Sequence, residues 1–168
     1  MVKTIFRKDI KNVLMQPDSR GVKEAYYLIL AKHQTIFVVS AGLNGSEFNK
    51  TAGFISQTQG IQIYQCLNGQ GLMLLQRNDE EGKAKEFKVM TLNQGKQVEL
   101  PTGWAISLIN IGKNFLVVVA NINVDNSEFT TKPIEEKQGL VYYVLEKKGE
   151  IAFEQNSNYS VYPQITTE

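Results

Sequence analysis

The sequence predicts an all-β fold, a single-domain antiparallel sandwich or barrel. Short runs rich in β-branched and aromatic residues recur along the chain. Gly, Asn, Asp and Pro separate these runs at intervals of about 8–12 residues, a spacing typical of sandwiches and barrels. Helical periodicity is scarce. With 168 residues, 42% of them hydrophobic, the chain is long enough for one domain with a substantial core.

We expect nine or ten strands. The first pair covers residues 24–31 (EAYYLILA) and 35–40 (TIFVVS), joined by a short link that contains His33. Residues 61–67 (IQIYQCL) alternate apolar and polar side chains and end at Asn68-Gly69, a strong hairpin signal. The later strands are expected at 72–77, 84–90, 97–100, 105–109, 115–119, 140–145 and 151–153.

Two short helices are predicted. Asp9 is placed to cap a helix over residues 10–15, before Pro17, and a second helical turn is expected near residues 134–136.

Composition argues against several function classes. The chain has 18 basic and 17 acidic side chains and no long basic run, so a nucleic-acid partner has little electrostatic support. No apolar stretch reaches the roughly 20 residues of a membrane helix, and the N-terminus does not resemble a signal peptide. One cysteine, Cys66, fits a reducing compartment, so we expect a cytoplasmic protein without a membrane partner.

The stretch GKQVELPTGWAISLIN, from Gly95 to Asn110, is the most informative motif. It reads G-x5-P-x-G-x2-Ile-x3-N. This pattern resembles the second sequence motif of the cupin superfamily at every backbone-determining position. The resemblance implies a jelly-roll barrel, also called a double-stranded β-helix. Ile106 stands where metal-binding cupins carry a histidine ligand.

Further segments resemble one cupin family in the same order along the chain. They are EFNKTAGFIS (47–56), NGQGLMLLQ (68–76), WAISLINIG (104–112) and GLVYYVLEKKGEIAF (139–153). They are similar to the cupin-type glucose-6-phosphate isomerases of archaea and some bacteria. The resemblance implies N-terminal strands or an arm over residues 1–35, a barrel over 36–155 and a C-terminal tail over 156–168. It also implies a homodimer formed through the N-terminal strands.

The metal ligands of that family are missing here. Aligning forward from Glu47 places Phe54 and Ser56 at the paired histidines, whereas aligning backward from Gln62 places Gly53 and Ile55 there. Gln62 occupies the position of the carboxylate ligand and Ile106 that of the last histidine. Because the chain has a single histidine, it also cannot build a site from two imidazoles. We therefore expect a metal-free pocket and no cofactor.

The resemblance also implies ligand-binding positions. Thr51 and Gly53 match residues that bind the substrate phosphate, although Gly53 could equally serve only a turn. Gln62 could bind a sugar hydroxyl or a neighbouring strand, and Tyr64 and Trp104 could line the barrel and stack on a sugar or simply pack. Phe129 takes the place of a family tyrosine.

The other reactive side chains have simpler interpretations. Cys66 is expected to be a buried apolar residue, and His33 a surface residue. The nearest carboxylates, Glu47 and Glu99, have no supported position inside the barrel.

Three functional hypotheses follow. The first is a metal-free cupin that binds a sugar phosphate or a similar small polar ligand without turning it over. The second is an active glucose-6-phosphate isomerase with an altered site, which would need an acid and a base or a metal. The third is a scaffold or regulatory protein whose barrel is filled by apolar side chains.

Overall fold

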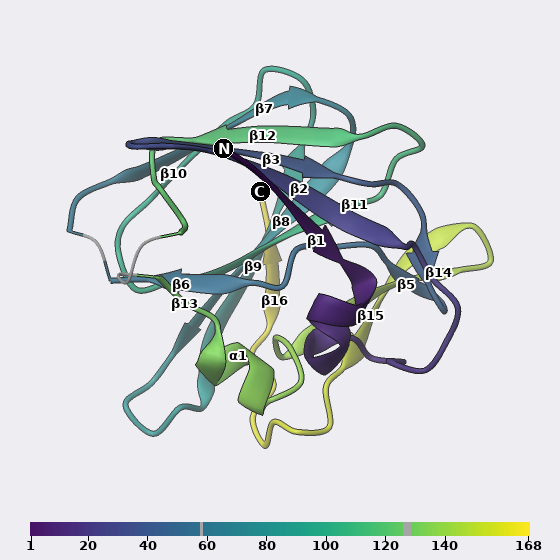
Figure 1. The fold of residues 1–168 in the computed structure, drawn as a ribbon. Coiled ribbons are helices and arrows are strands. Elements are labelled where there is room, and N and C mark those ends of the chain that lie inside the picture. The colour runs from purple at the N-terminus through teal and green to yellow at the C-terminus, as the bar shows by residue number, and fades with distance from the viewer. Residues whose placement is uncertain (58, 126–128) are drawn as a thin grey trace.

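The computed structural model describes residues 1–57, 59–125 and 129–168 and shows two facing sheets with a third sheet packed outside them (Figure 1). The first sheet is antiparallel and has the order β1-β2-β3-β12-β7-β10. Its strands are β1 (Val2–Phe6), β2 (Glu24–Ala31), β3 (Gln34–Val39), β12 (Leu116–Ala120), β7 (Gln62–Asn68) and β10 (Gln97–Leu100).

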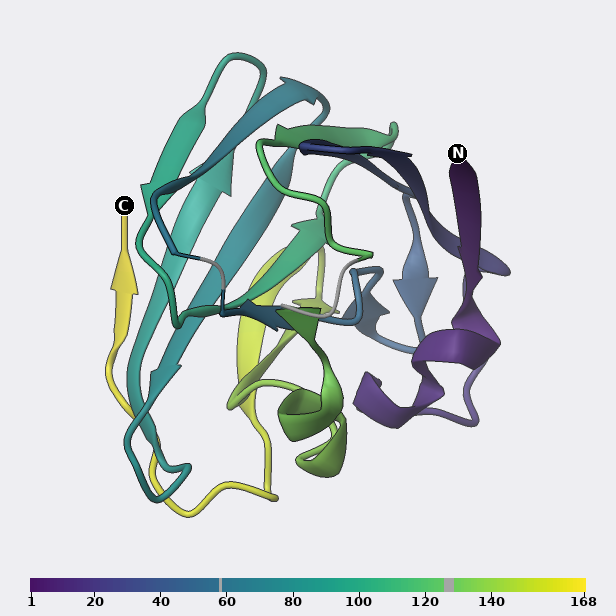
Figure 2. The same cartoon turned by 60° about the vertical axis from the view of Figure 1, so that its left-hand side comes forward.

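The second sheet has the order β13-β6-β11-β8-β9-β16 and lies opposite the first. Its strands are β13 (Phe129–Thr130), β6 (Phe54–Ser56), β11 (Ala105–Asn110), β8 (Gly71–Asn78), β9 (Ala84–Leu92) and β16 (Ile165–Thr167). β16 pairs with β9 in parallel, which corrects the expectation of a wholly antiparallel fold. Figure 2 shows β16 running along the edge of this sheet. The segment 156–168 therefore contributes an edge strand that covers β9.

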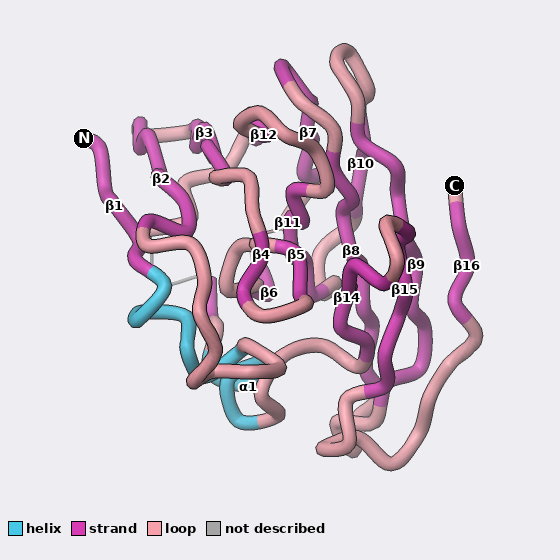
Figure 3. Tube along the Cα trace, turned by 90° about the vertical axis from the view of Figure 1, so that its right-hand side faces the viewer, coloured by secondary structure: helices cyan, strands magenta, loops and turns pink. Residues whose placement is uncertain are grey.

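A third, smaller sheet covers the outer face of the second. It consists of β15 (Glu150–Gln155), β14 (Tyr142–Lys147), β5 (Glu47–Phe48) and β4 (Leu43–Asn44). The β14–β15 hairpin runs alongside β8 and β9 (Figure 3), and the rings of Tyr142 and Phe87 lie 4.9 Å apart. The Val141 N–H also donates to Gln76 Oε1 at 2.8 Å. The second sheet is thus buried on both faces, which explains why β8 begins with five consecutive apolar residues, 71–75, all of them buried.

Helical structure is sparse in the described residues. The predicted helix at 10–15 is instead the 3₁₀ helix η1 (Arg7–Val13), because Asp9 accepts from the Phe6 N–H at 2.8 Å and starts the turn earlier. The expected turn near 134–136 is α1 (Lys132–Glu136), with a proline in its first turn. Figure 2 shows η1 and α1 together at one end of the barrel. No helix in the described ranges has the length and apolarity needed to cross a bilayer.

Several strands begin and end close to the predicted residues because local turn chemistry defines them. β10 covers 97–100 as expected, between a turn at Gly95 and Pro101. Gly69 has φ +89°, and a Cβ at this position would lie 2.5 Å from the Phe115 carbonyl oxygen. The β7–β8 turn therefore requires glycine for both its dihedral angle and its space.

Candidate functional site: the barrel lumen

Two of the residues at the expected metal positions, Phe54 and Ile106, lie in one row across the second sheet. Ile106 on β11 pairs with Phe54 on β6 and with Leu75 on β8. Directly paired residues point to the same face of a sheet, and this face looks into the barrel lumen. Ile106 is fully buried, and Phe54 and Leu75 are nearly so. The next row, with Leu108 and Met73 paired, is equally closed.

An aromatic stack crosses the lumen at this row. Phe54 lies parallel to Phe37 of the first sheet, with ring centroids 5.7 Å apart and an interplanar angle of 1°. Phe129 meets Phe54 edge to face at 5.7 Å. The prominent pockets of the described residues lie elsewhere, and none of them is lined by Phe54, Ser56, Gln62 or Ile106. Apolar side chains therefore fill the place where a cupin metal centre would sit.

Strand pairing shows which residues around position 54 face the lumen. Lys50 lies opposite Ile109, whereas Phe54 lies opposite Ile106, so the chain holds one extra residue between these two pairs. This bulge includes Gly53, whose φ is +88°. Beyond it, Phe54 and Ser56 share the lumen face, and both are buried. Phe54 and Ser56, the pair given by aligning forward from Glu47, thus lie on the lumen face, whereas Ile55 pairs with Ala105 on the opposite face.

Thr51 and Gly53 form part of this bulge. The Thr51 N–H donates to the Leu108 carbonyl at 2.9 Å, and Thr51 Oγ1 accepts from the Leu108 N–H at 3.0 Å. The hydroxyl thus replaces a main-chain carbonyl in the pairing with β11, and Thr51 is 1% exposed. A Cβ on Gly53 would lie 3.2 Å from Ile134 of α1. Both residues serve the local backbone, and the Thr51 hydroxyl does not face an open pocket.

Gln62 and Tyr64 are brought together inside the barrel. They lie two residues apart on β7, so their side chains point to the same face, and both are buried. The Tyr64 hydroxyl donates to Gln62 Oε1 at 2.8 Å. Burial raises the pKa of the Tyr64 phenol, which stays neutral across the physiological range. The amide at the former carboxylate position therefore satisfies a neighbouring tyrosine within the packed lumen.

The donor set at the four positions does not fit a transition metal. Phenylalanine and isoleucine have no lone pairs to offer, and serine and a neutral amide are weak ligands beside imidazole and carboxylate. No group of three or more His, Cys, Asp or Glu side chains suited to a metal ion occurs among the described residues. We derive no chemical step through a metal here.

Trp104 directly precedes β11 at the rim of the barrel and packs against the core from there. It is partly exposed. Lys88 Nζ lies 5.3 Å from the centroid of its ring, and Arg77 Cζ lies 5.9 Å away. Sequence reasoning did not single out Lys88 and Arg77, because their proximity to Trp104 depends on the pairing of β8 with β9 and β11.

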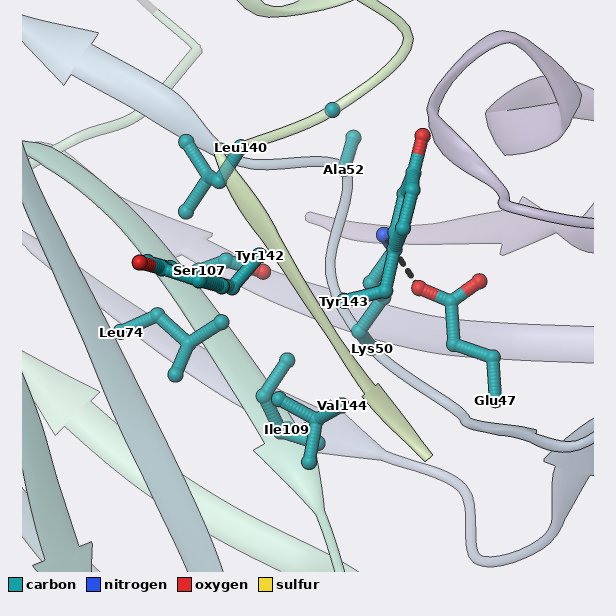
Figure 4. Close-up of a pocket in the computed structure, with 11 residues that line it drawn as sticks. Glu47, Lys50, Ala52, Leu74, Ser107, Ile109, Leu140, Tyr142, Tyr143 and Val144 are labelled. Atoms are coloured by element: carbon teal, nitrogen blue, oxygen red, sulfur yellow. Dashed lines mark ion pairs between the residues drawn. The ribbon is translucent and has the colours of Figure 1, made fainter. Parts of the chain in front are cut away.

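A buried ion pair lies outside the lumen, between β5, η1 and β14 (Figure 4). Lys50 Nζ is 2.7 Å from Glu47 Oε2 and donates to the Val13 carbonyl at 2.7 Å. Glu47 Oε1 accepts from the Met15 N–H at 2.9 Å. The adjoining cavity has space for about one water molecule, roughly 10 Å³. Glu47 is thus a structural carboxylate that ties the N-terminal segment to the third sheet.

Tyr143 lies over the same pair, with its ring centroid 5.1 Å from Lys50 Nζ. Burial raises the pKa of its phenol, and the Glu47 charge adds to this rise. Glu99 is exposed on β10, and His33 is exposed in the β2–β3 link. Cys66 is fully buried, and burial raises the pKa of its thiol, as expected for a packing residue.

Comparison with known proteins places the chain in a family. The family model described as "Glucose-6-phosphate isomerase (GPI)" matches residues 19–162, well over half of the chain. The chain belongs to this family. Together with the two facing sheets, the match identifies the fold as an all-β cupin barrel of the GPI type. The comparison with curated proteins found no match.

Solved structures with a similar fold have low sequence identity. An oxalate oxidase in complex with the substrate analogue glycolate has a TM-score of 0.47 and 15% identity, over 60% of this chain and 46% of that one. The Drosophila melanogaster CENP-C cupin domain has a TM-score of 0.44 and 12% identity, over 67% and 80% of the two chains. Bacillus subtilis oxalate decarboxylase has a TM-score of 0.43 and 16% identity, over 67% and 28%. This chain thus spans less than half of the oxalate oxidase chain.

Proposed function

We propose that this protein is a metal-free member of the GPI family that binds a small polar ligand, such as a sugar phosphate, without turning it over. The observation that carries the first part is the row Phe54–Ile106–Leu75, closed from the other sheet by Phe37. A side chain that packs this well against its neighbours leaves no coordination sphere. The family relation supports the second part, the class of ligand.

A packed lumen limits where a ligand can bind. Tyr64, Phe37 and Ile106 are 1% exposed or less, and moving any of them would open a cavity that costs several kcal/mol. A sugar phosphate would therefore bind at the rim of the barrel and not at its centre.

The isomerase alternative has less support. Aldose–ketose isomerisation without a metal needs a base near the substrate carbon that loses its proton. Glu47 is buried outside the lumen and paired with Lys50, and Glu99 faces solvent from the outer side of β10. Neither carboxylate is positioned to act on a sugar in the barrel.

A coupled assay for fructose 6-phosphate, with and without added Fe²⁺, Mn²⁺ or Zn²⁺, tests this proposal together with calorimetric titration of glucose 6-phosphate. We expect binding at millimolar ligand or below and no turnover above background under any metal condition. Turnover that depends on the protein would overturn the proposal that the protein binds its ligand without catalysis. Absence of binding at millimolar concentrations would overturn the choice of ligand.

The outer face of the first sheet supports self-association, which the family resemblance also implied. One row across it pairs Val2, Ile29, Ile36 and Val119 in order, and the next pairs Tyr27, Val38 and Val117. Neither row carries a charge. Most of the exposed large hydrophobic side chains of the described residues lie on or beside this face, including Val2 (66% exposed), Ile29 (40%), Ile61 (63%), Leu67 (43%) and Phe115 (49%).

We propose that a second copy of the chain covers this face. Two copies related by a two-fold axis would bring apolar rows against apolar rows, with no charge left unpaired. Five strands about 4.8 Å apart, over a length of roughly 20 Å, give a flat area on the order of 500 Å². Side chains that project from the sheet add to this flat area, which brings it near the roughly 800 Å² per partner of a standard interface.

Sedimentation equilibrium of Ile29→Lys tests the dimer, with Ile151→Lys as a matched control. Ile151 is 44% exposed on the β14–β15 hairpin, away from the proposed face. We expect the wild type and Ile151→Lys to be dimeric and Ile29→Lys to be monomeric. A monomeric wild type would refute the proposal, and so would a dimer that survives Ile29→Lys unchanged.

A further inference from the structure

Three charged side chains form a cluster with the only tryptophan of the chain. This rim cluster consists of Trp104, Lys88, Arg77 and Glu86. Lys88 pairs with Leu75, which in turn pairs with Ile106, so the Lys88 side chain leaves the sheet on the lumen face. Arg77 and Glu86 pair directly in the next row on the same face. The cluster therefore lies at the mouth of the barrel, two strands from the closed metal position.

The charge of the rim cluster favours an anion. A hydrogen bond from Arg77 lowers the pKa of the Glu86 carboxyl, and the charges of Arg77, Lys88 and Lys85 act in the same direction. Glu86 thus neutralises Arg77. Among the residues that the structure describes, no carboxylate lies within ion-pair distance of Lys88. Lys88 makes no such direct ion pair, so the two cations Arg77 and Lys88 and the one carboxylate Glu86 leave the rim cluster with a net positive charge.

We propose that the rim cluster is the binding site for an anionic sugar such as a hexose phosphate. The indole of Trp104 offers a flat apolar face for the sugar ring. Lys88 and Arg77 now lie over this ring, and their ammonium and planar guanidinium groups can donate to the oxygens of one phosphate. The inference rests on the proposed function and gives it a location that leaves the packed lumen intact.

Geometry supports the rim over the other polar surfaces of the barrel. The Thr51 hydroxyl oxygen and the Gln62 amide oxygen already accept hydrogen bonds inside the fold. The two cations approach a single partly exposed ring from different strands, Arg77 from β8 and Lys88 from β9. A ligand would exchange the present cation–indole contacts for a sugar–indole contact and ion pairs.

Because Trp104 is the single tryptophan, its fluorescence reports directly on this site. Titrations with glucose 6-phosphate, glucose and inorganic phosphate separate the contributions of the ring and the anion. We expect a saturable change with glucose 6-phosphate and at least fivefold weaker binding of the other two. Lys88→Gln should weaken glucose 6-phosphate binding at least fivefold. Lys85→Gln, which removes an exposed cation on the same strand, should change it less than twofold.

The failure of this inference can be distinguished from the failure of the proposed function. Calorimetric binding of glucose 6-phosphate with no change in Trp104 fluorescence and normal affinity in Lys88→Gln would refute the rim site alone. No calorimetric binding by the wild type would refute both. Thermal unfolding of each variant checks that a loss of binding does not come from a loss of folded protein.

Discussion

The buried pair of Glu47 and Lys50 makes Glu47→Gln a severe test of how this fold is held together. In the variant, Lys50 stays buried with an 8% exposed side chain and loses the carboxylate at 2.7 Å. Removing one partner of a buried ion pair costs about 3–5 kcal/mol, because the other charge remains without compensation. The amide still accepts from the Met15 N–H, so that hydrogen bond does not add to the loss. This cost is a large part of the roughly 5–15 kcal/mol that stabilises a typical domain.

Urea unfolding followed by circular dichroism measures this effect. We expect Glu47→Gln to lower the free energy of unfolding by about 3–5 kcal/mol, and Glu47→Leu/Lys50→Met to recover at least half of that loss. Glu81→Gln is the control, because it removes an exposed ion pair with Lys83 and should cost less than about 1 kcal/mol. A Glu47→Gln protein within 1 kcal/mol of the wild type would show that water or backbone movement compensates Lys50. A loss of activity in this variant would not identify a catalytic base.

Three further predictions concern the core, a turn and the response to alkali. Phe54→Ala removes the stack that crosses the lumen and should cost about 3–5 kcal/mol in urea unfolding, whereas a dispensable ring would cost less than 1. Gly69→Ala should destabilise by at least 1 kcal/mol more than Gly82→Ala, because both have positive φ but only the Cβ at residue 69 meets backbone; equal thermal shifts would contradict this. Burial raises the pKa of Tyr26 to about 12 from 10.0, so its contribution is complete below pH 10 and disappears as the pH rises to about 12. Tyr26→Phe should therefore lose about 2–3 kcal/mol less stability than the wild type between pH 10 and 12, and parallel stability curves would refute this.

Local chemistry explains which elements were predictable. Residues 24–31 and 97–100 form strands at the expected positions because β-branched and aromatic side chains alternate there and turns bound them. β5 and β6 were not predicted, because they are two and three residues long and pair only with distant segments. β16 was missed for the same reason, since its partner β9 lies more than 70 residues earlier in the chain.

The candidate site was predictable in identity and only partly in place. Ile106 and Gln62 followed from motif spacing, and both lie in the lumen. Spacing left two alignments open at the histidine pair, and the one-residue bulge before Phe54 puts Phe54 and Ser56 on the lumen face. For Trp104 the sequence left lining the barrel and packing both open, and the residue lies just before the start of β11, where Lys88 and Arg77 contact its ring.

The order of residues alone predicted an all-β barrel, because turn residues and alternating apolar residues act over a few positions, and the resemblance of its motifs added the cupin family. Only the tertiary structure decided that the vacated centre is filled, since Phe37 and Phe54 come from different sheets and meet only when the sheets face each other. The same holds for Glu47 and Lys50, three residues apart in sequence, whose burial depends on the N-terminal segment and β14 closing over them.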